Sequence, residues 1–187
     1  MKNMRVKNAV IGKQFKDSKN LQEFLRVAND RRINVIVVES GDRIDIERNL
    51  YFDVLWPDES NKIDENVINN NALVCKLNYK NFSMLFTGDI EEEAENVLIY
   101  KYEANDILKS TLLKVPHHGS KSSSTEKFLK LVNPKVALIG VGENNKFGHP
   151  NSVVLERLFN FGTVIYRTDE EGEVCINVYN DGRFKKE

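Results

Sequence analysis

The segment LKVPHHGS, residues 113–120, combines the end of an apolar strand with two adjacent histidines. Residues 112–115 are mostly apolar and too few for a helix, so we predict a strand that stops at Pro116. His117 and His118 then follow directly, beside Gly119. Metal-competent side chains placed on a loop that leaves a strand are typical of functional loops in layered folds. The segment therefore predicts a sheet with functional side chains on the loops at one edge.

Two more strand ends carry side chains of the same kind. Asp89 lies in LFTGDIE, residues 85–91, and His149 lies in FGHP, residues 147–150. The chain has 3 histidines, and all of them fall between residues 117 and 149. Loops at one edge of an α/β sheet converge on a common crevice. We therefore expect Asp89, His117, His118 and His149 to share one rim.

Imidazole and carboxylate groups suit Zn, Mn or Fe, and a carboxylate can bridge two cations. Cations bridged in this way lower the pKa of a bound water and clamp the oxygens of a phosphodiester. Ser120 and residues 122–124 add hydroxyls and helix-start amides that can hold phosphate oxygens. Taken singly, each motif has an ordinary alternative, since Gly-Asp and the serines can cap helices and the histidine motifs can be turns. Their order and shared context favour a metal-dependent site with Asp89, His117 and His118 as its catalytic groups.

Hydrophobic periodicity predicts strands and helices along the whole chain. The expected strands are 6–11, 35–38, 43–47, 51–56, 73–79, 82–86, 112–115, 136–141, 163–166 and 173–179. The expected helices are 20–32, 91–103, 125–132 and 151–159, with Ser123 or Ser124 capping the third. Residues 58–71 are polar and predict a loop. The mixture of hairpins and β-α-β alternation predicts one α/β domain of layered sheets and helices over residues 1–187.

Composition describes an ordinary globular protein. The 187 residues are 41% hydrophobic and 29% charged, and the formal net charge is −1, so no global field would gather nucleic acid. Cys75 and Cys175 lie in apolar runs and are expected to be buried thiols. Residues 1–5 do not resemble a signal peptide, and no apolar run approaches the ~20 residues that cross a bilayer. These features predict a soluble, cytoplasmic chain.

The segments 85–91, 113–124, 145–150 and 166–169 closely resemble the metallo-β-lactamase domain of ComEC-type competence proteins. The resemblance covers residues 70–172, more than half of the chain. It implies an αββα sandwich with a two-metal site, holding Zn or Mn, at one edge of the paired sheets. It also implies a hydrolase and, for the DNA-uptake branch, a nuclease with DNA as its substrate.

The resemblance assigns roles to residues of this chain. Asp89 resembles the bridging carboxylate and His149 the last histidine ligand, while His117 and His118 resemble the paired histidines of the site. We favour His118 as the ligand and keep His117 as the alternative. The other expected contributors are Asn70, as a weak ligand, a neighbour of one or a loop cap; Ser120, as a phosphate contact; and Asp169, as an orienting group or a turn residue.

One departure from the family pattern lies upstream. The fold's signature is a His-x-(His/Asp)-x-Asp-His cluster in its first third, and this chain has no histidine before His117. We expect an N-terminally incomplete domain that binds one metal ion weakly or none and hydrolyses little by itself. We also expect an exposed sheet edge that favours a homodimer.

Three functions are compatible with this sequence. The first is a metal-dependent phosphodiesterase or nuclease of DNA uptake. The second is a non-catalytic remnant or interaction module. The third is a metallo-hydrolase of another ester or of a lactam, because a fold does not fix its substrate.

Overall fold

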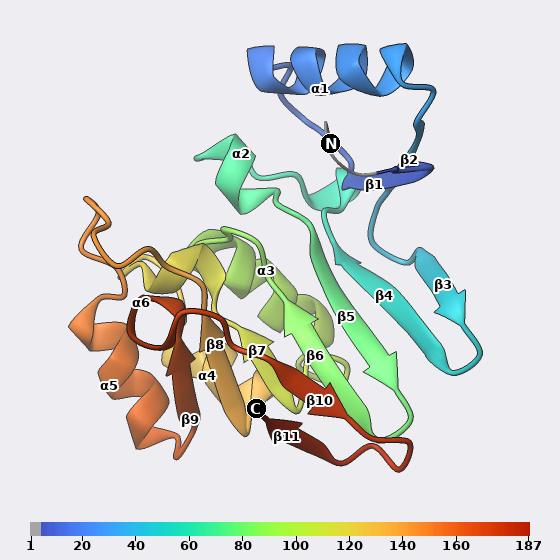
Figure 1. The fold of residues 1–187 in the computed structure, drawn as a ribbon. Coiled ribbons are helices and arrows are strands. Elements are labelled where there is room, and N and C mark those ends of the chain that lie inside the picture. The colour runs from blue at the N-terminus through green and yellow to red at the C-terminus, as the bar shows by residue number, and fades with distance from the viewer. Residues whose placement is uncertain (1–4) are drawn as a thin grey trace.

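A seven-stranded mixed sheet forms the centre of the computed structural model, which describes residues 5–187. The strand order is β3-β4-β5-β6-β7-β8-β9, and Figure 1 shows the sheet crossing the molecule. Neighbours from β3 to β6 are antiparallel, and neighbours from β6 to β9 are parallel. The strand bounds are β3 Arg43–Glu47, β4 Leu50–Trp56, β5 Val74–Tyr79, β6 Phe82–Phe86, β7 Leu112–Lys114, β8 Val136–Ile139 and β9 Val164–Arg167.

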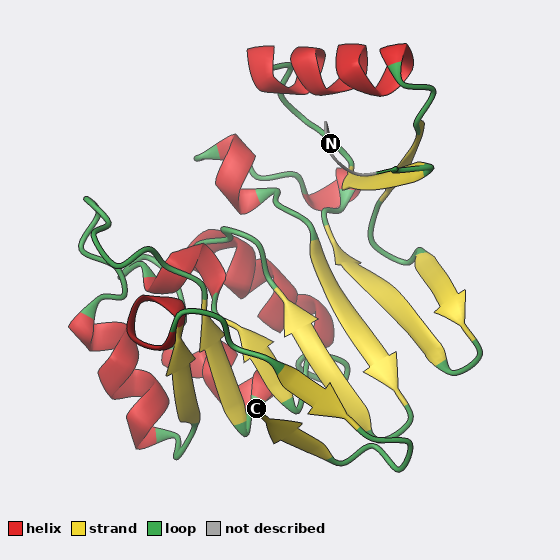
Figure 2. Cartoon of the chain, viewed as in Figure 1, coloured by secondary structure: helices red, strands yellow, loops and turns green. Residues whose placement is uncertain are grey.

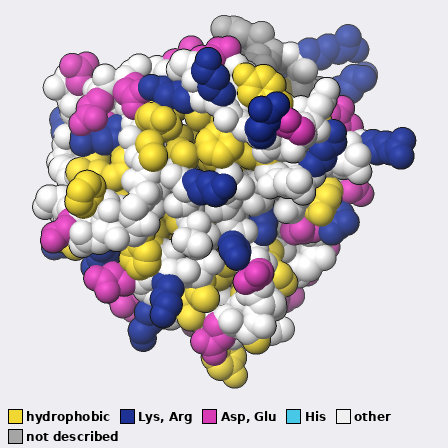
Figure 3. Space-filling model, turned by 90° about the horizontal axis from the view of Figure 1, so that it is seen from below, with side chains coloured by type: hydrophobic (Ala, Val, Ile, Leu, Met, Phe, Trp, Pro, Cys, Tyr) yellow, Lys and Arg dark blue, Asp and Glu magenta, His cyan; other side chains and the backbone are white. Residues whose placement is uncertain are grey.

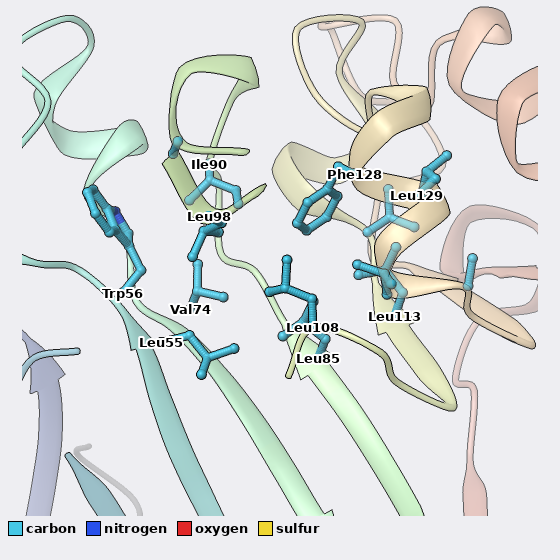
Figure 4. Packing of buried hydrophobic residues seen from close by; sticks show 14 of the residues in the cluster. Leu55, Trp56, Val74, Leu85, Ile90, Leu98, Leu108, Leu113, Phe128 and Leu129 are labelled. Atoms are coloured by element: carbon cyan, nitrogen blue, oxygen red, sulfur yellow. The ribbon is translucent and has the colours of Figure 1, made fainter. Parts of the chain in front are cut away.

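Helices cover one face of this sheet and enclose the main core. They are α3 (Glu92–Tyr102), α4 (Glu126–Val132) and α5 (Ser152–Asn160). Leu98 of α3 and Phe128 of α4 pack with Leu85 of β6 and Leu113 of β7, and none of these side chains is exposed (Figure 4). Burying each such side chain contributes about 2 to 3 kcal/mol to folding. This core fixes the parallel strands whose ends carry the histidines.

A hairpin covers the other face. It is formed by β10 (Ile176–Val178) and β11 (Phe184–Lys186). Phe184 packs against Phe82 with ring centroids 5.9 Å apart, in a second apolar cluster that also contains Leu112. Leu112 and its neighbour Leu113 therefore enter different clusters, because successive strand residues point to opposite faces. The predicted α/β layering is confirmed, as the alternation of helices and strands in Figure 2 shows.

The first elements form a separate βαβ unit beside the upper end of the sheet (Figure 1). β1 (Asn8–Gly12) and β2 (Asn34–Val38) pair in parallel, and α1 (Lys19–Asp30) connects them. The unit contacts the large sheet at Gly12, where a Cβ would lie 3.2 Å from both Leu73 and Pro57. Within residues 5–187, β1 and β2 pair only with each other.

Most predicted elements are confirmed to within two or three residues at each end, and three regions differ. The predicted loop 58–71 contains a 3₁₀ turn, Glu59–Asn61, and a short helix, α2 (Val67–Asn70). A further helix, α6 (Thr168–Glu171), and strand β11 were not expected from the sequence. The helix is a single turn and the strand is very short, so neither has enough residues to show a hydrophobic period.

The cap of α4 was predicted wrongly. Thr125, and not Ser123 or Ser124, accepts the N–H of Phe128 at 3.4 Å. Ser123 instead donates to the carbonyl of Pro116 at 3.1 Å, so its hydroxyl holds the histidine loop.

The cysteine prediction was also wrong in part. Cys75 is half-buried in β5, but Cys175 is exposed, because the segment before β10 runs over the surface. Both thiols are free. No helix among the described residues is long and apolar enough to cross a membrane. The prediction about a signal peptide concerns residues 1–5, of which 1–4 lie outside the described range.

Candidate functional site

The carboxyl ends of the parallel strands β6, β7 and β8 meet at one edge of the sheet. Asp89 follows β6, His117 and His118 follow β7, and His149 lies in the loop between β8 and α5. Crevices at this edge are the usual place for ligands in open α/β sheets. The opposite end of the molecule, drawn in Figure 3, shows apolar, basic and acidic side chains and no histidine among the described residues.

Asp89 and His118 form the centre of this rim. Oδ1 of Asp89 lies 3.5 Å from Nε2 of His118, and each side chain is 47% exposed. Nδ1 of His118 lies 2.5 Å from the carbonyl oxygen of Gly140. A carbonyl only accepts hydrogen bonds, so the proton of a neutral His118 is on Nδ1 and the lone pair is on Nε2.

Two acceptor atoms therefore face each other across 3.5 Å when His118 is neutral. A cation between or beside them, either a proton on Nε2 or a metal ion, makes this arrangement favourable. An imidazole whose second nitrogen donates to a backbone carbonyl is the usual form of a metal-ligating histidine. The pair is consequently suited to hold a cation.

The backbone of the histidine loop is left-handed at three consecutive residues. The φ angles are 47° at His117, 53° at His118 and 80° at Gly119. Each non-glycine residue in this region costs about 1 to 2 kcal/mol. A Cβ at Gly119 would lie 2.7 Å from Cβ of Pro150, so glycine is needed there. The loop thereby brings the two histidines close to the segment that carries His149.

His117 lies deeper than His118, with 23% of its side chain exposed. Its Nδ1 is 3.3 Å from Oε1 of Glu91, within ion-pair distance but not aligned for a hydrogen bond. Its ring meets the ring of His149 edge to face, with centroids 5.7 Å apart. The buried Nδ1 of His117 thus has a carboxylate beside it and no hydrogen-bond partner in the described structure.

Glu91 is held by two neighbouring side chains. Oε1 accepts from Ser122 Oγ at 3.0 Å, and Oε2 accepts from Asn66 Nδ2 at 2.8 Å. Sequence reasoning missed this residue, although it lies two positions after Asp89 in the motif that carries the resemblance. Its contacts with separate loops show that it orients the rim around His117.

His149 is positioned by Asn145. The Oδ1 of Asn145 accepts the N–H of His149 at 3.0 Å, and its Nδ2 donates to the carbonyl of His149 at 2.7 Å. Burial lowers the pKa of His149 below its ordinary value, the neighbouring His117 and His118 lower it further, and Asp89 opposes them. A lowered pKa favours the neutral imidazole, which is the form that binds metals.

The three other expected site residues have partners of their own. Asn70 is fully buried, and its Oδ1 accepts the N–H of Glu91 at 3.0 Å, so it orients the start of α3. Ser120 Oγ lies 2.9 Å from Ser122 Oγ, inside the serine loop. These contacts make both residues supports of the rim rather than groups that face solvent.

Asp169 pairs with Arg167 and not with a histidine among the described residues. Nε of Arg167 donates to Oδ1 of Asp169 at 3.1 Å, and Nη2 donates to Oδ2 at 2.6 Å. This bidentate pair holds the pKa of Asp169 below its usual range. Asp169 therefore stabilises the turn at the end of β9.

The donor chemistry of the rim fits a metal ion, but the number of converging donors is small. Asp89 supplies a carboxylate, and His118 supplies an oriented Nε2. Within residues 5–187, no group of three or more His, Cys, Asp or Glu side chains is arranged to hold an ion. Asp89 and His118 are therefore a pair of facing donors, without a third such side chain beside them among the described residues.

Comparison with known proteins agrees with this geometry. The metallo-beta-lactamase superfamily matches residues 69–143, which contain Asp89, His117 and His118. The chain is also 33% identical over 180 residues to ComE operon protein 3 of Bacillus subtilis strain 168. Residues 69–143 therefore belong to the metallo-beta-lactamase superfamily. The curated relatives include a competence protein, ComA, so the predicted resemblance is confirmed.

This metallo-beta-lactamase domain matches only part of each relative. The similarity covers 96% of the chain and 22% of ComE operon protein 3. Competence protein ComA of Neisseria gonorrhoeae is 35% identical over 131 residues, which are 70% of this chain and 18% of ComA. The chain thus spans about a fifth of the length of these relatives. A solved protein of Parabacteroides distasonis, assigned as a metal-dependent hydrolase, aligns with a TM-score of 0.48 and 12% identity over 88% of this chain and 78% of that one.

Proposed function

We propose that this chain is the metal-dependent hydrolase domain of a DNA-uptake protein and acts on phosphodiester bonds. The relationship between Asp89 and His118 carries the proposal, because a carboxylate and an oriented imidazole 3.5 Å apart are suited to bind a cation. The similarity to competence proteins supports nucleic acid as the substrate.

In this proposal Asp89 and His118 hold the ion, which is Zn or Mn, and His149 is the third ligand that the family resemblance implies, although no three such side chains of the described residues are arranged around one point. Such an ion supplies a Lewis acid and a bound water of lowered pKa. The chain's own residues orient these donors: Gly140 fixes the tautomer of His118, and Asn145 fixes the backbone of His149. His117 is the candidate for moving a proton, because its Nδ1 lies 3.3 Å from the carboxylate of Glu91.

A first experiment measures metal binding by the apo-protein, using titration calorimetry with Zn and Mn. We expect weak binding of one ion, and loss of binding in Asp89→Asn and His118→Ala. Asp45→Asn is the matched control, because Asp45 is exposed on β3, away from the rim. Binding that is unchanged in both rim variants would contradict the proposed site.

A second experiment tests the substrate. Single-stranded DNA, bis-p-nitrophenyl phosphate and nitrocefin are incubated with the protein and added Mn or Zn. Hydrolysis of the two phosphodiesters, abolished by Asp89→Asn, supports the proposal. Hydrolysis of nitrocefin alone points to a lactam substrate.

A non-catalytic interaction module is the second candidate. The small number of converging donors among the described residues favours it. Metal binding without hydrolysis of any of the three substrates would establish this second candidate over the first.

A further inference from the structure

Phe147 is a large apolar side chain that stands in solvent at the edge of the site. Its exposed fraction is 81%, although it lies one residue from Gly148 and two from His149. Its ring is nearly parallel to that of His149, with an interplanar angle of 17° and centroids 5.9 Å apart. Most of the ring surface is therefore free to contact another planar group.

The loop that presents Phe147 is held in place. Asn145 Oδ1 accepts the N–H of Phe147 at 3.2 Å as well as that of His149. Asn145 Nδ2 donates to the carbonyl of His149 at 2.7 Å and to that of Gly142 at 3.2 Å. One amide thus makes four hydrogen bonds within residues 142–149. A loop backbone fixed in this way loses little conformational entropy when a ligand binds to it.

A pocket adjoins the ring. Its volume is about 340 Å³, and His118, Gly140, Phe147, His149 and Thr168 are among the residues that line it. That volume is at the lower end of the range for small-molecule sites, about 300 to 1,000 Å³. The pocket shares His118 and His149 with the proposed metal site, so a group bound here lies beside the reacting atoms.

Lys114 lies behind Gly140, one of the residues that line this pocket. Its Cε lies 3.4 Å from where a Cβ of Gly140 would be, so the side chain runs under a residue that lines the pocket. Its Nζ donates to the carbonyl of Val115 at 3.0 Å and forms no ion pair among the described residues. Burial lowers the pKa of Lys114, and the negative charge of Asp89 opposes this shift. A half-buried ammonium without an ion pair attracts an anion.

We propose that the pocket binds one nucleotide of a single-stranded nucleic acid, with its base stacked on Phe147 and its phosphate attracted by Lys114. This inference rests on the proposed function and adds a substrate preference to it. Stacking on an aromatic side chain requires a base that is not paired in a duplex. The pocket therefore selects single strands over double strands and accepts different bases, because every base has a flat face.

Fluorescence anisotropy of a labelled oligothymidylate, measured in chelator and low salt, tests the inference without any hydrolysis. The comparison ligand is an abasic oligomer of equal length, which has the same phosphates and no bases. We expect Phe147→Ala to weaken oligothymidylate binding about tenfold, the effect of losing one stacked base, and to leave abasic binding unchanged. Phe159→Ala is the matched control, because Phe159 is 77% exposed on α5 and does not line the pocket.

Lys114→Gln separates charge from stacking. We expect it to weaken both oligomers by similar factors and to reduce the slope of log affinity against log salt by about one. Equal affinity of wild type and Phe147→Ala for oligothymidylate would overturn the inference, as would equal wild-type affinity for both oligomers.

The outcome is separable from the proposed function. Hydrolysis of bis-p-nitrophenyl phosphate that depends on Asp89 but is accompanied by no base-dependent binding refutes only the nucleotide pocket. Base-dependent binding that Phe147→Ala removes, without hydrolysis of any phosphodiester, supports the pocket and refutes only the hydrolase.

Discussion

Glu95 Oε1 accepts the backbone N–H of Ser124 at 2.5 Å. Glu95 lies on α3, and its side chain is fully buried. Its Oε2 accepts the N–H of Thr125 at 2.8 Å. The carboxylate of one helix therefore anchors the serine loop that follows the two histidines. Glu91 lies four residues earlier on the same chain segment and contacts the same loop through Ser122. The start of α3 thus determines where the histidine loop lies.

The first prediction follows from the titration of Glu95. Burial raises its pKa from 4.5 to about 7, although the two N–H donors oppose this shift and Glu92 adds to it. Between pH 4.5 and about 7, Glu95 therefore keeps its proton in the folded state and has lost it in the unfolded state. Stability contributed by this group is complete below about pH 4.5 and is lost as the pH rises to about 7, a change on the order of 3 kcal/mol.

Glu95→Gln removes this contribution, so its free energy of unfolding should fall less steeply than that of wild type over the same pH window. Urea denaturation at several pH values measures the difference. Glu103→Gln, at an exposed position on the C-terminal side of α3, should retain the wild-type slope. Parallel curves for wild type and Glu95→Gln would contradict the assignment.

The second prediction concerns Gly119. Its φ of 80° disfavours any side chain, and a Cβ at this position would lie only 2.7 Å from Cβ of Pro150. We expect Gly119→Ala to lower the free energy of unfolding by about 2 to 5 kcal/mol, the sum of backbone strain and overpacking.

Two other glycines divide this effect into its parts. Gly162 has a φ of 69°, and a Cβ there would meet nothing within 4 Å, so Gly162→Ala should cost about 1 to 2 kcal/mol. Gly142 has open space and no positive φ, so Gly142→Ala should stay within about 0.5 kcal/mol of wild type. If Gly119→Ala costs no more than Gly162→Ala, the contact with Pro150 is not tight.

The third prediction is the tautomer of His118. Because the carbonyl of Gly140 accepts from Nδ1, nitrogen NMR at neutral pH should show a protonated Nδ1 and, when the ring is neutral, an unprotonated Nε2. Added Zn should shift the Nε2 resonance of His118 and leave Nδ1 protonated. Asp89→Asn should remove the Zn-dependent shift. An Nε2–H tautomer in the apo-protein would rule out the proposed orientation.

The fourth prediction concerns association between copies of the chain. β2 exposes two apolar side chains, Ile36 at 41% and Val37 at 57%. Strands with an unpaired edge tend to pair with another chain. We expect size-exclusion chromatography at several concentrations to show a homodimer that Val37→Lys dissociates.

The matched control for association is Ile68→Lys. Ile68 is 58% exposed on α2, outside the βαβ unit, so this variant should elute as wild type does. A monomer at every concentration would remove the basis for a dimer formed through this edge.

Local patterns were sufficient for most of the fold. Alternation of apolar residues located the sheet strands, and the period of 3.6 located α1, α3, α4 and α5, because burial of one face imposes those periods. Short elements such as α2 and α6 escaped, since a single turn carries too few residues to show a period. The exposed Cys175 was missed for a related reason, because an apolar sequence does not reveal whether another element covers it.

The site was predictable only in outline. Strand ends followed by Gly-Asp, His-His and Gly-His-Pro indicated one rim, and the structure places Asp89 and His118 together there. The supports of that rim were not predictable. Glu95 reaches Ser124 across 29 positions of the chain, and Asn145 holds Phe147 through an amide whose partners depend on the loop shape.

By itself, the sequence determined the α/β class, the positions of most strands along the chain and the chemical types at the sheet edge. Periodicity and strand-end motifs act over a few neighbouring residues, so they can be read without a fold. Tertiary structure alone decided which nitrogen of His118 faces Asp89, that Asn70 and Asp169 are occupied by other partners, and that Phe147 remains exposed. Side-chain direction depends on the left-handed backbone at residues 117–119 and on contacts between segments far apart in the chain, which no local pattern contains.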